Sequence, residues 1–311
     1  MSENGKFRLV TRSDFDGIVC AVLLQELGMI DDIKFVHPKD VQDGKVELTG
    51  RDITTNLPYV GTCHLVFDHH ASEVARTGGQ AANLIIDPEA ASAARVVYRH
   101  YGGVSRFPRI SEDLMAAVDK ADSAQFSRDD ILTPKGWDLL SFVMDPRAGL
   151  GRFRQFRISN YALMMDLIGY CRELPIEKIL ELPDVKERTE LFQQLSGPFQ
   201  DQLRSCSTVH GNLVVLDLRH ADPIYPGNRF VIYALHPQCN ISIHLMWGMK
   251  QQNTVFAIGK SILNRTSRTD IGELCLGYGG GGHTNAGTLQ VDNDASERVL
   301  AELVEKIVRD G

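Results

Sequence analysis

The sequence predicts a two-domain α/β protein whose N-terminal domain is built on a mostly parallel sheet flanked by helices. Apolar runs of strand length alternate with helix-like runs over the first third of the chain, which is typical of parallel sheets. Several of these runs end in carboxylates or imidazoles. A second group of strand-like runs follows a polar, helix-prone stretch, and 311 residues are enough for two hydrophobic cores.

The first predicted unit is a strand over Phe7–Thr11, a loop, and a buried helix over Ile18–Leu27 that ends at Gly28. The loop holds two carboxylates, Asp14 and Asp16, followed by a glycine that allows a tight turn into the helix. Further strands are expected at Ile33–Val36, at Val46–Thr49 running into Asp52, at Cys63–Phe67 and at Asn83–Ile86.

The strand at Cys63–Phe67 runs into Asp68-His69-His70. Ligands of open parallel sheets bind beyond the carboxyl ends of the strands, where these side chains and the earlier aspartates are expected to lie. Helix capping could account for one or two of the aspartates, but it does not account for the histidines.

Two helices are expected next, at Ala91–Tyr101 and Ile110–Ala121. The second carries Asp119 and is followed by Asp122, three residues later, and either could complete a metal site. For Asp119 a solvated helix position is the preferred interpretation. Residues 131–207 are mostly helical in pattern, and their local arginine cluster (Arg147, Arg152, Arg154 and Arg157) is interpreted as solvated surface.

We predict domains at 1–185 and 208–311, joined by a helical linker at 186–207. In the second domain, a strand is expected at Asn212–Leu218, a hairpin at Ile241–Gly248 and Val255–Lys260, a short helix at Asp270–Leu276 and a strand at Ala286–Val291. Asp294 and Glu297 form a potential capping box for a closing helix to Val308.

Four consecutive glycines, Gly279, Gly280, Gly281 and Gly282, precede His283. Glycine backbones can approach an anion closely, and the histidine adds a donor. A flexible hinge is the alternative interpretation, but the order of helix, glycines, histidine and strand favours binding. Tyr278 could stack on a base.

Composition limits the class of partner. The chain is 43% hydrophobic and its net charge is −7, which argues against a surface that grips long duplex nucleic acid. A small anionic substrate at bound cations remains compatible. No apolar run suggests a membrane span, Met1–Lys6 shows no secretory signal, and six scattered cysteines suggest reduced thiols, so we expect a cytoplasmic protein that binds no membrane.

Taken together, these stretches resemble the DHH phosphoesterase superfamily, in the branch with a DHH-associated domain. The resemblance covers nearly the whole chain. It rests on five stretches in the family's order: Asp14-Phe15-Asp16-Gly17, an isolated Asp52, Asp68-His69-His70, Asp122-Ser123 with Phe126, and Gly279-Gly280-Gly281-Gly282-His283 with Ala286-Gly287.

The resemblance implies a manganese-dependent phosphohydrolase with its active site in the cleft between the two domains. It implies that Asp14 binds one metal ion, that Asp16, His69 and Asp122 bind a second, and that Asp52 bridges both. It places Asp68 and His70 either behind the metal ligands or against the scissile phosphate. It places Gly279, Gly280, Gly281, Gly282 and His283, with Arg265, on the rest of the substrate. Carboxylate and imidazole ligands independently suit manganese, with magnesium or cobalt as alternatives.

One position departs from the family. Many members carry a metal-binding histidine just before the Asp-x-Asp stretch, where this chain has Arg12. Arginine is always cationic and cannot ligate a metal. Three alternatives follow: the first metal is held less tightly, another residue such as His37 replaces that ligand, or Arg12 contacts the substrate phosphate as part of the catalytic group.

The resulting hypothesis is a metal-dependent phosphodiesterase that cuts short oligoribonucleotides or a linear dinucleotide such as pGpG to mononucleotides. The alternatives are an exopolyphosphatase, a nucleotide 3′,5′-bisphosphate phosphatase, and, in another class, a nucleotide-binding sensor with an impaired metal site. The sequence leaves the choice between monomer and homodimer open.

Overall fold

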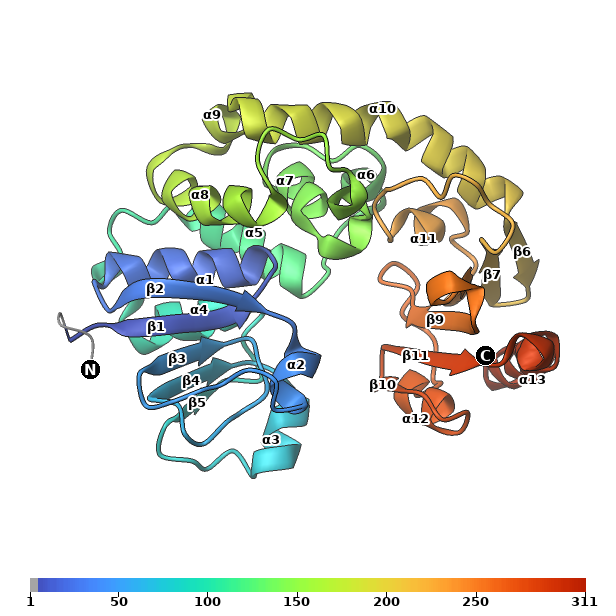
Figure 1. Ribbon diagram of the computed structural model, residues 1–311, viewed down its shortest axis with the longest axis horizontal. Coiled ribbons are helices and arrows are strands. Elements are labelled where there is room, and N and C mark those ends of the chain that lie inside the picture. Colours follow the sequence, from blue (N-terminus) through green and yellow to red (C-terminus); the bar gives the residue numbers. More distant parts are fainter. Residues whose placement is uncertain (1–4) are drawn as a thin grey trace. The chain divides into compact units, whose positions relative to one another are not determined.

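The computed structural model describes residues 5–311 and confirms the α/β class (Figure 1). The chain forms two compact units. Unit 1 contains the chain up to Gln125 together with Lys135–Glu190, and unit 2 contains Phe126–Pro134 and Leu191–Gly311. All six cysteines are free thiols, as predicted. Within residues 5–311, every helix is too short or too polar to cross a bilayer; residues 1–4 of the polar start lie outside the described part.

Unit 1 is built on a five-stranded sheet in the order β2-β1-β3-β4-β5, and every neighbouring pair is parallel. All carboxyl ends therefore lie at one edge, as the sequence predicts. The strands are β1 (Phe7–Arg12), β2 (Ile30–Val36), β3 (Asp52–Thr55), β4 (Leu65–Asp68) and β5 (Leu84–Ile86).

The helices of unit 1 pack around α1, whose residues from Phe15 to Leu24 are all buried. Helices α4, α5 and α8 contact α1, and the other sheet face is covered by α2 and irregular segments through Val41, Leu57 and Cys63. The bounds are α1 (Phe15–Glu26), α2 (Pro38–Gln42), α3 (Ala71–Thr77), α4 (Ala93–His100), α5 (Glu112–Asp122), α7 (Gly136–Met144), α8 (Asn160–Glu173) and α9 (Ile176–Glu181).

The third strand differs from the prediction. Val46–Thr49 is irregular, and β3 starts only at Asp52. The four residues of β3 are all buried although three of them are polar, because Thr54 and Thr55 lie in the sheet and the Thr55 hydroxyl donates to the Thr11 hydroxyl at 2.7 Å. A strand of buried threonines has little apolar pattern, so the prediction selected the more apolar stretch before it.

Unit 2 is built on a six-stranded mixed sheet in the order β10-β11-β9-β8-β7-β6, with β7 and β8 as the parallel pair. The predicted hairpin of β8 and β9 is confirmed. Helices α12 and α13 cover one face through Ile271, Cys275 and Leu303. The strands are β6 (Ser207–His210), β7 (Leu213–Asp217), β8 (Ile241–Trp247), β9 (Thr254–Lys260), β10 (Gly281–His283) and β11 (Ala286–Val291); the helices are α11 (Val231–Leu235), α12 (Ile271–Leu276) and α13 (Ser296–Asp310).

A short piece from the middle of the chain belongs to unit 2. Helix α6 (Arg128–Leu132) packs on α11, where Arg128 Nε donates to the Ala234 carbonyl at 3.2 Å. The Phe126 and Phe230 rings lie beside this contact, 6.0 Å apart. Helix α10 (Pro183–Ser205) spans the predicted linker and continues through Pro198.

The predicted capping box at the start of the last helix is wrong. Helix α13 has Ala295 at its N-cap and no side-chain capping bond. The carboxylate of Glu297 pairs instead with Arg219 at 2.7 Å. Glu297 therefore forms an ion pair with a residue far away in the chain, and not the capping bond at the helix terminus that the local sequence pattern predicted.

Candidate metal centre

The turn between β1 and α1 delivers the first two carboxylates of the site. Asp14 is the N-cap of α1 and accepts the Gly17 amide at 3.1 Å. A Cβ on Gly17 would lie 2.0 Å from the Arg12 carbonyl oxygen, so this turn requires glycine. The prediction that Gly17 permits a tight entry into the helix is thereby confirmed.

Asp16 lies in the first turn of α1 and is 2% exposed. Its oxygens accept the Ala93 and Ala94 amides at the start of α4, at 3.2 and 2.8 Å. Burial raises the pKa of Asp16 well above its ordinary range, and the carboxylates of Asp122 and Asp14 raise it further. A buried group of like charges of this kind becomes stable when a cation neutralises it.

The end of β4 presents the Asp-His-His motif. Asp68 is buried, and its Oδ1 accepts the His69 and His70 amides at 2.8 and 3.3 Å and the His70 Nδ1 at 2.7 Å. This aspartate therefore fixes the backbone of the motif and orients the partly exposed imidazole of His70. The other oxygen, Asp68 Oδ2, is buried without a hydrogen-bond partner.

His69 faces Asp122, the last residue of α5. Its Nε2 lies 2.9 Å from Asp122 Oδ2, and its Nδ1 lies 3.2 Å from the Ala90 carbonyl oxygen. A carbonyl can only accept, so Nδ1 carries the proton, and in a neutral ring Nε2 turns a lone pair toward a carboxylate. Burial opposes the charged ring, but the hydrogen bond and charge of Asp122 raise the pKa of His69 to about 9.

These side chains fit a divalent cation. One ligand atom each from Asp16, His69 and Asp122 lies within 4.8 Å of the others. A cation would take the place of the His69 Nε2 proton that Asp122 accepts, and the Ala90 carbonyl would hold the ligating ring in the required tautomer. Two carboxylates and an imidazole suit manganese or magnesium. Asp68, His69 and His70 also lie close enough together, but the two groups share His69, whose one ligating nitrogen, Nε2, already faces Asp122.

Two arginines lie among the carboxylates. Arg12 Nε bonds Asp14 Oδ2 at 2.9 Å. Arg147 bonds Asp145 at 2.8 Å. Desolvation lowers the pKa of Arg147, but the charges of Asp145, Asp14 and Asp122 outweigh it and raise the pKa. The Arg147 side chain is half exposed, in line with the predicted solvated surface, and the charges of Asp14 and Asp122 act on it as well.

Asp52 does not lie where the sequence predicted. It begins β3, in register with Arg8 near the start of β1, and so lies at the opposite edge of the sheet from the ends of β1 and β4. Its oxygens accept Arg8 Nε at 2.6 Å and the Thr49 amide at 2.7 Å. Its predicted position at a carboxyl end is wrong, and the geometry gives no support to a metal-bridging role.

The residue that does follow β3 is Asn56, which sequence reasoning missed. Thr55 pairs with Phe67, so Asn56 comes next to Asp68 in register. Asn56 is 2% exposed, has a left-handed backbone at φ 55°, and neither atom of its carboxamide has a hydrogen-bond partner. An asparagine directly after a strand was a usable signal, because asparagine is enriched at left-handed positions.

Two other candidates have structural partners. Asp119 accepts the Ser92 hydroxyl and Arg95 Nε, both at 2.7 Å, so it braces α4 against α5 rather than standing solvated. His37 is the N-cap of α2, where its Nδ1 accepts the Lys39 amide at 3.1 Å. The Nδ1 atom of His37 is therefore occupied by the backbone at the start of α2.

In unit 2 the glycine run forms a close-packed hairpin. A Cβ on Gly280 would lie 2.2 Å from the Thr288 carbonyl oxygen, and one on Gly282 would lie 2.3 Å from that of Ala286. His283 is exposed in β10, and Arg265 Nε donates to the Ile262 carbonyl at 3.0 Å. Tyr278 bonds Glu302 and Lys306 at 3.1 and 2.8 Å, so its hydroxyl serves the packing of α13.

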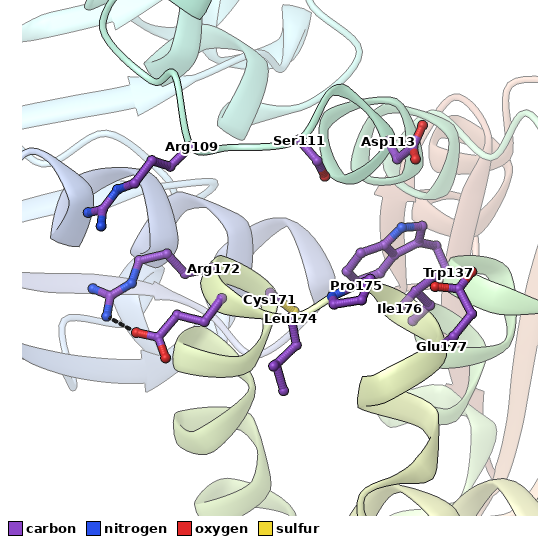
Figure 2. Close-up of a pocket in the computed structure, with 11 residues that line it drawn as sticks. Arg109, Ser111, Asp113, Trp137, Cys171, Arg172, Leu174, Pro175, Ile176 and Glu177 are labelled. Carbon is purple, nitrogen blue, oxygen red and sulfur yellow. Dashed lines mark hydrogen bonds and ion pairs between the residues drawn. The ribbon is translucent and has the colours of Figure 1, made fainter.

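A cavity of about 280 Å³ lies elsewhere in unit 1, between the start of α5, the start of α7 and the α8–α9 connection (Figure 2). Trp137 lines it with Arg109 and Arg172, and Figure 2 shows the Arg172 guanidinium bonded to the adjacent Glu173. No residue of the metal centre lines this cavity.

No family model and no curated protein matches the chain. Among solved structures, the pGpG-specific phosphodiesterase PggH from Vibrio cholerae is 58% identical, with a TM-score of 0.87 over 98% of this chain and 100% of that chain. A manganese-bound RecJ exonuclease is 15% identical, with a TM-score of 0.48 over 98% of this chain and 91% of that chain.

Of these two, PggH is similar enough over its whole length to assign a family. The carboxylates after β1 and the Asp-His-His motif after β4 are in the arrangement that the sequence predicted. The chain therefore belongs to the DHH phosphoesterase family, together with PggH.

Proposed function

We propose that this protein hydrolyses linear dinucleotides, with pGpG as the substrate, to mononucleotides with the help of a divalent cation. The observation that carries the substrate is the 58% identity to a pGpG-specific phosphodiesterase over 98% of this chain. The phosphoric ester hydrolase class follows from the family, and the expectations of manganese as the cation and of a cytoplasmic location remain predictions.

Asp16, His69 and Asp122 would hold the cation. Such an ion lowers the pKa of bound water and neutralises charge on the phosphoryl group. In the reaction, water adds to phosphorus, the bond from phosphorus to one ester oxygen breaks, and that oxygen leaves as a hydroxyl after taking a proton.

His70 is suited to supply that proton. Asp68 Oδ1 accepts the Nδ1 proton at 2.7 Å, which fixes the ring and leaves Nε2 directed away from this bond. Arg12, at the end of β1, would contact a non-bridging phosphate oxygen, since a guanidinium matches phosphate geometry. The proposed substrate contacts of the glycine run, His283 and Arg265 rest on the family resemblance.

The test is a substrate panel with manganese and the purified full-length chain. We expect pGpG to be cleaved faster than longer RNA, a 3′,5′-bisphosphate nucleotide or polyphosphate. Preference for polyphosphate or for the bisphosphate nucleotide would support the corresponding phosphatase instead. Tight pGpG binding without turnover at any metal concentration would support a sensor.

Asp122→Asn provides the site-directed arm of this experiment. We expect its activity to fall by at least about a hundredfold, because a ligand facing His69 loses its charge. Asp113→Asn is the matched control, since Asp113 is an exposed aspartate in the first turn of the same helix. Equal activities of the two variants would contradict the assignment of Asp122.

A further inference from the structure

We infer that this centre takes a single divalent ion, and that the guanidinium of Arg12 supplies the positive charge that the family resemblance assigns to a second ion. This inference rests on the proposed use of a divalent cation. It departs from the two-ion site that the sequence led us to expect, because the residues present fit one ion and do not fit two.

The carboxylates expected to hold the other ion are already engaged. Asp14 Oδ1 accepts the Gly17 amide at 3.1 Å and Oδ2 bonds Arg12 at 2.9 Å. Asp52 bonds Arg8 at 2.6 Å at the far edge of the sheet. Within residues 5–311, neither aspartate joins a group of three ligands close enough to share a cation.

The residue that replaces Asp52 at the carboxyl edge is neutral. Asn56 directly follows β3 and comes next to Asp68 in register, and its carboxamide is buried without a partner. A carboxamide oxygen is a weaker ligand than a carboxylate and cannot offset the charge of a second cation. An asparagine at this position therefore removes the bridging charge on which a two-ion centre depends.

The charges balance with one ion. The carboxylates of Asp14, Asp16 and Asp122 lie close enough for their charges to interact with one another. One guanidinium and one divalent cation neutralise these three carboxylates. The nearby Asp145 already has Arg147 as its partner, and Asp68 Oδ1 accepts the His69 and His70 amides and His70 Nδ1. A second divalent ion would leave uncompensated positive charge beside the fixed cation of Arg12.

Two measurements on the wild-type protein decide the ion count without any activity assay. Manganese titration followed by elemental analysis is expected to saturate at one tightly bound ion per chain. Electron paramagnetic resonance should then show the spectrum of an isolated Mn²⁺ ion. Two ions per chain with an exchange-coupled spectrum would overturn the inference, and so would the absence of any tightly bound ion.

A double variant tests the cause. Arg12→His with Asn56→Asp releases Asp14, adds an imidazole and adds a carboxylate next to Asp68, so we expect two ions per chain and a coupled spectrum. Arg51→His is the control, because Arg51 is an exposed arginine that pairs with Asp31 outside the site. A folded double variant that still binds one ion would refute the roles assigned to Arg12 and Asn56. If the double variant does not fold, the number of manganese ions bound per wild-type chain still decides between one ion and two.

The same preparations should be assayed on pGpG so that two failures can be told apart. Two coupled ions together with rapid pGpG hydrolysis would overturn the single-ion inference and leave the proposed function intact. One bound ion without hydrolysis of pGpG would support the inference and contradict the proposed substrate.

Discussion

Two arginines determine how the aspartates of the N-terminal unit are used. Arg12 pairs with Asp14 at the carboxyl edge of the sheet, and Arg8 pairs with Asp52 at the opposite edge. The two arginines lie four residues apart on the same strand. Each neutralises a carboxylate that the family resemblance suggested as a metal ligand. Because the pairs lie at opposite edges of the sheet, we expect Arg12–Asp14 to affect catalysis and Arg8–Asp52 to affect stability.

Arg12→Ala should reduce catalytic efficiency without removing the metal ion. We expect kcat/KM on pGpG to fall by about ten- to a hundredfold, the equivalent of one lost charge-assisted hydrogen bond of about 1.5–3 kcal/mol. Steady-state kinetics and manganese analysis on the same sample check this. Loss of the bound ion in Arg12→Ala would contradict the assignment, and partial recovery in Arg12→Lys would separate charge from geometry.

Asp52→Ala should reduce stability rather than metal binding. The substitution leaves Arg8 Nε and the Thr49 amide without their acceptor, so we expect the free energy of unfolding to fall by about 1–3 kcal/mol. Urea unfolding measures this change, and Asp31→Ala, which breaks an exposed ion pair, is the comparison. A variant that loses its bound manganese with unchanged stability would restore Asp52 as a ligand.

The hairpin of β10 and β11 illustrates why glycines recur in unit 2. The hairpin packs closely on α12, and a Cβ on Gly272 would lie 3.0 Å from the Gly282 carbonyl group. The glycine run therefore has a packing role whether or not its amides also bind an anion. The adjacent residues Gly281 and Gly282 differ in how closely other atoms pack against them, so they form a matched pair for a test.

Gly282→Ala should destabilise the protein, whereas Gly281→Ala should not. The new Cβ on Gly282 would lie 2.3 Å from the Ala286 carbonyl oxygen, so we expect a loss of about 1–3 kcal/mol. No atom lies within 4 Å of a Cβ on Gly281, and its variant should stay within about 0.5 kcal/mol of wild type. Equal unfolding midpoints in urea would show that the hairpin can relax and that close packing does not explain the glycines.

At the scale of the whole molecule, net charge limits the substrate. A chain with net charge −7 repels a long polyanion, while a dinucleotide brings few phosphates. We expect turnover to fall steeply as RNA lengthens beyond a few nucleotides at moderate salt. Comparing pGpG with a 24-residue RNA, each at several salt concentrations, checks this, and equal rates would show that charge does not select the substrate.

Local patterns in the sequence were sufficient to predict most strands and helices and the positions of part of the candidate site. The α/β class, the β1–α1 turn with Asp14, Asp16 and Gly17, and the Asp-His-His motif after β4 were all predicted, because each rests on residues adjacent in the chain. The grouping of Asp16, His69 and Asp122 was predicted as well, although only the family resemblance brought the three together.

The tertiary structure alone decided the remainder. Strand β3 has no apolar pattern because its buried residues include threonines. Its pairing with β1 and β4 sets the register, which places Asp52 at the edge opposite the metal centre and Asn56 beside Asp68. Likewise, α6 packs with unit 2 although its sequence neighbours belong to unit 1. Both outcomes depend on contacts between residues far apart in the chain, and a pattern read over a few adjacent residues does not contain that information.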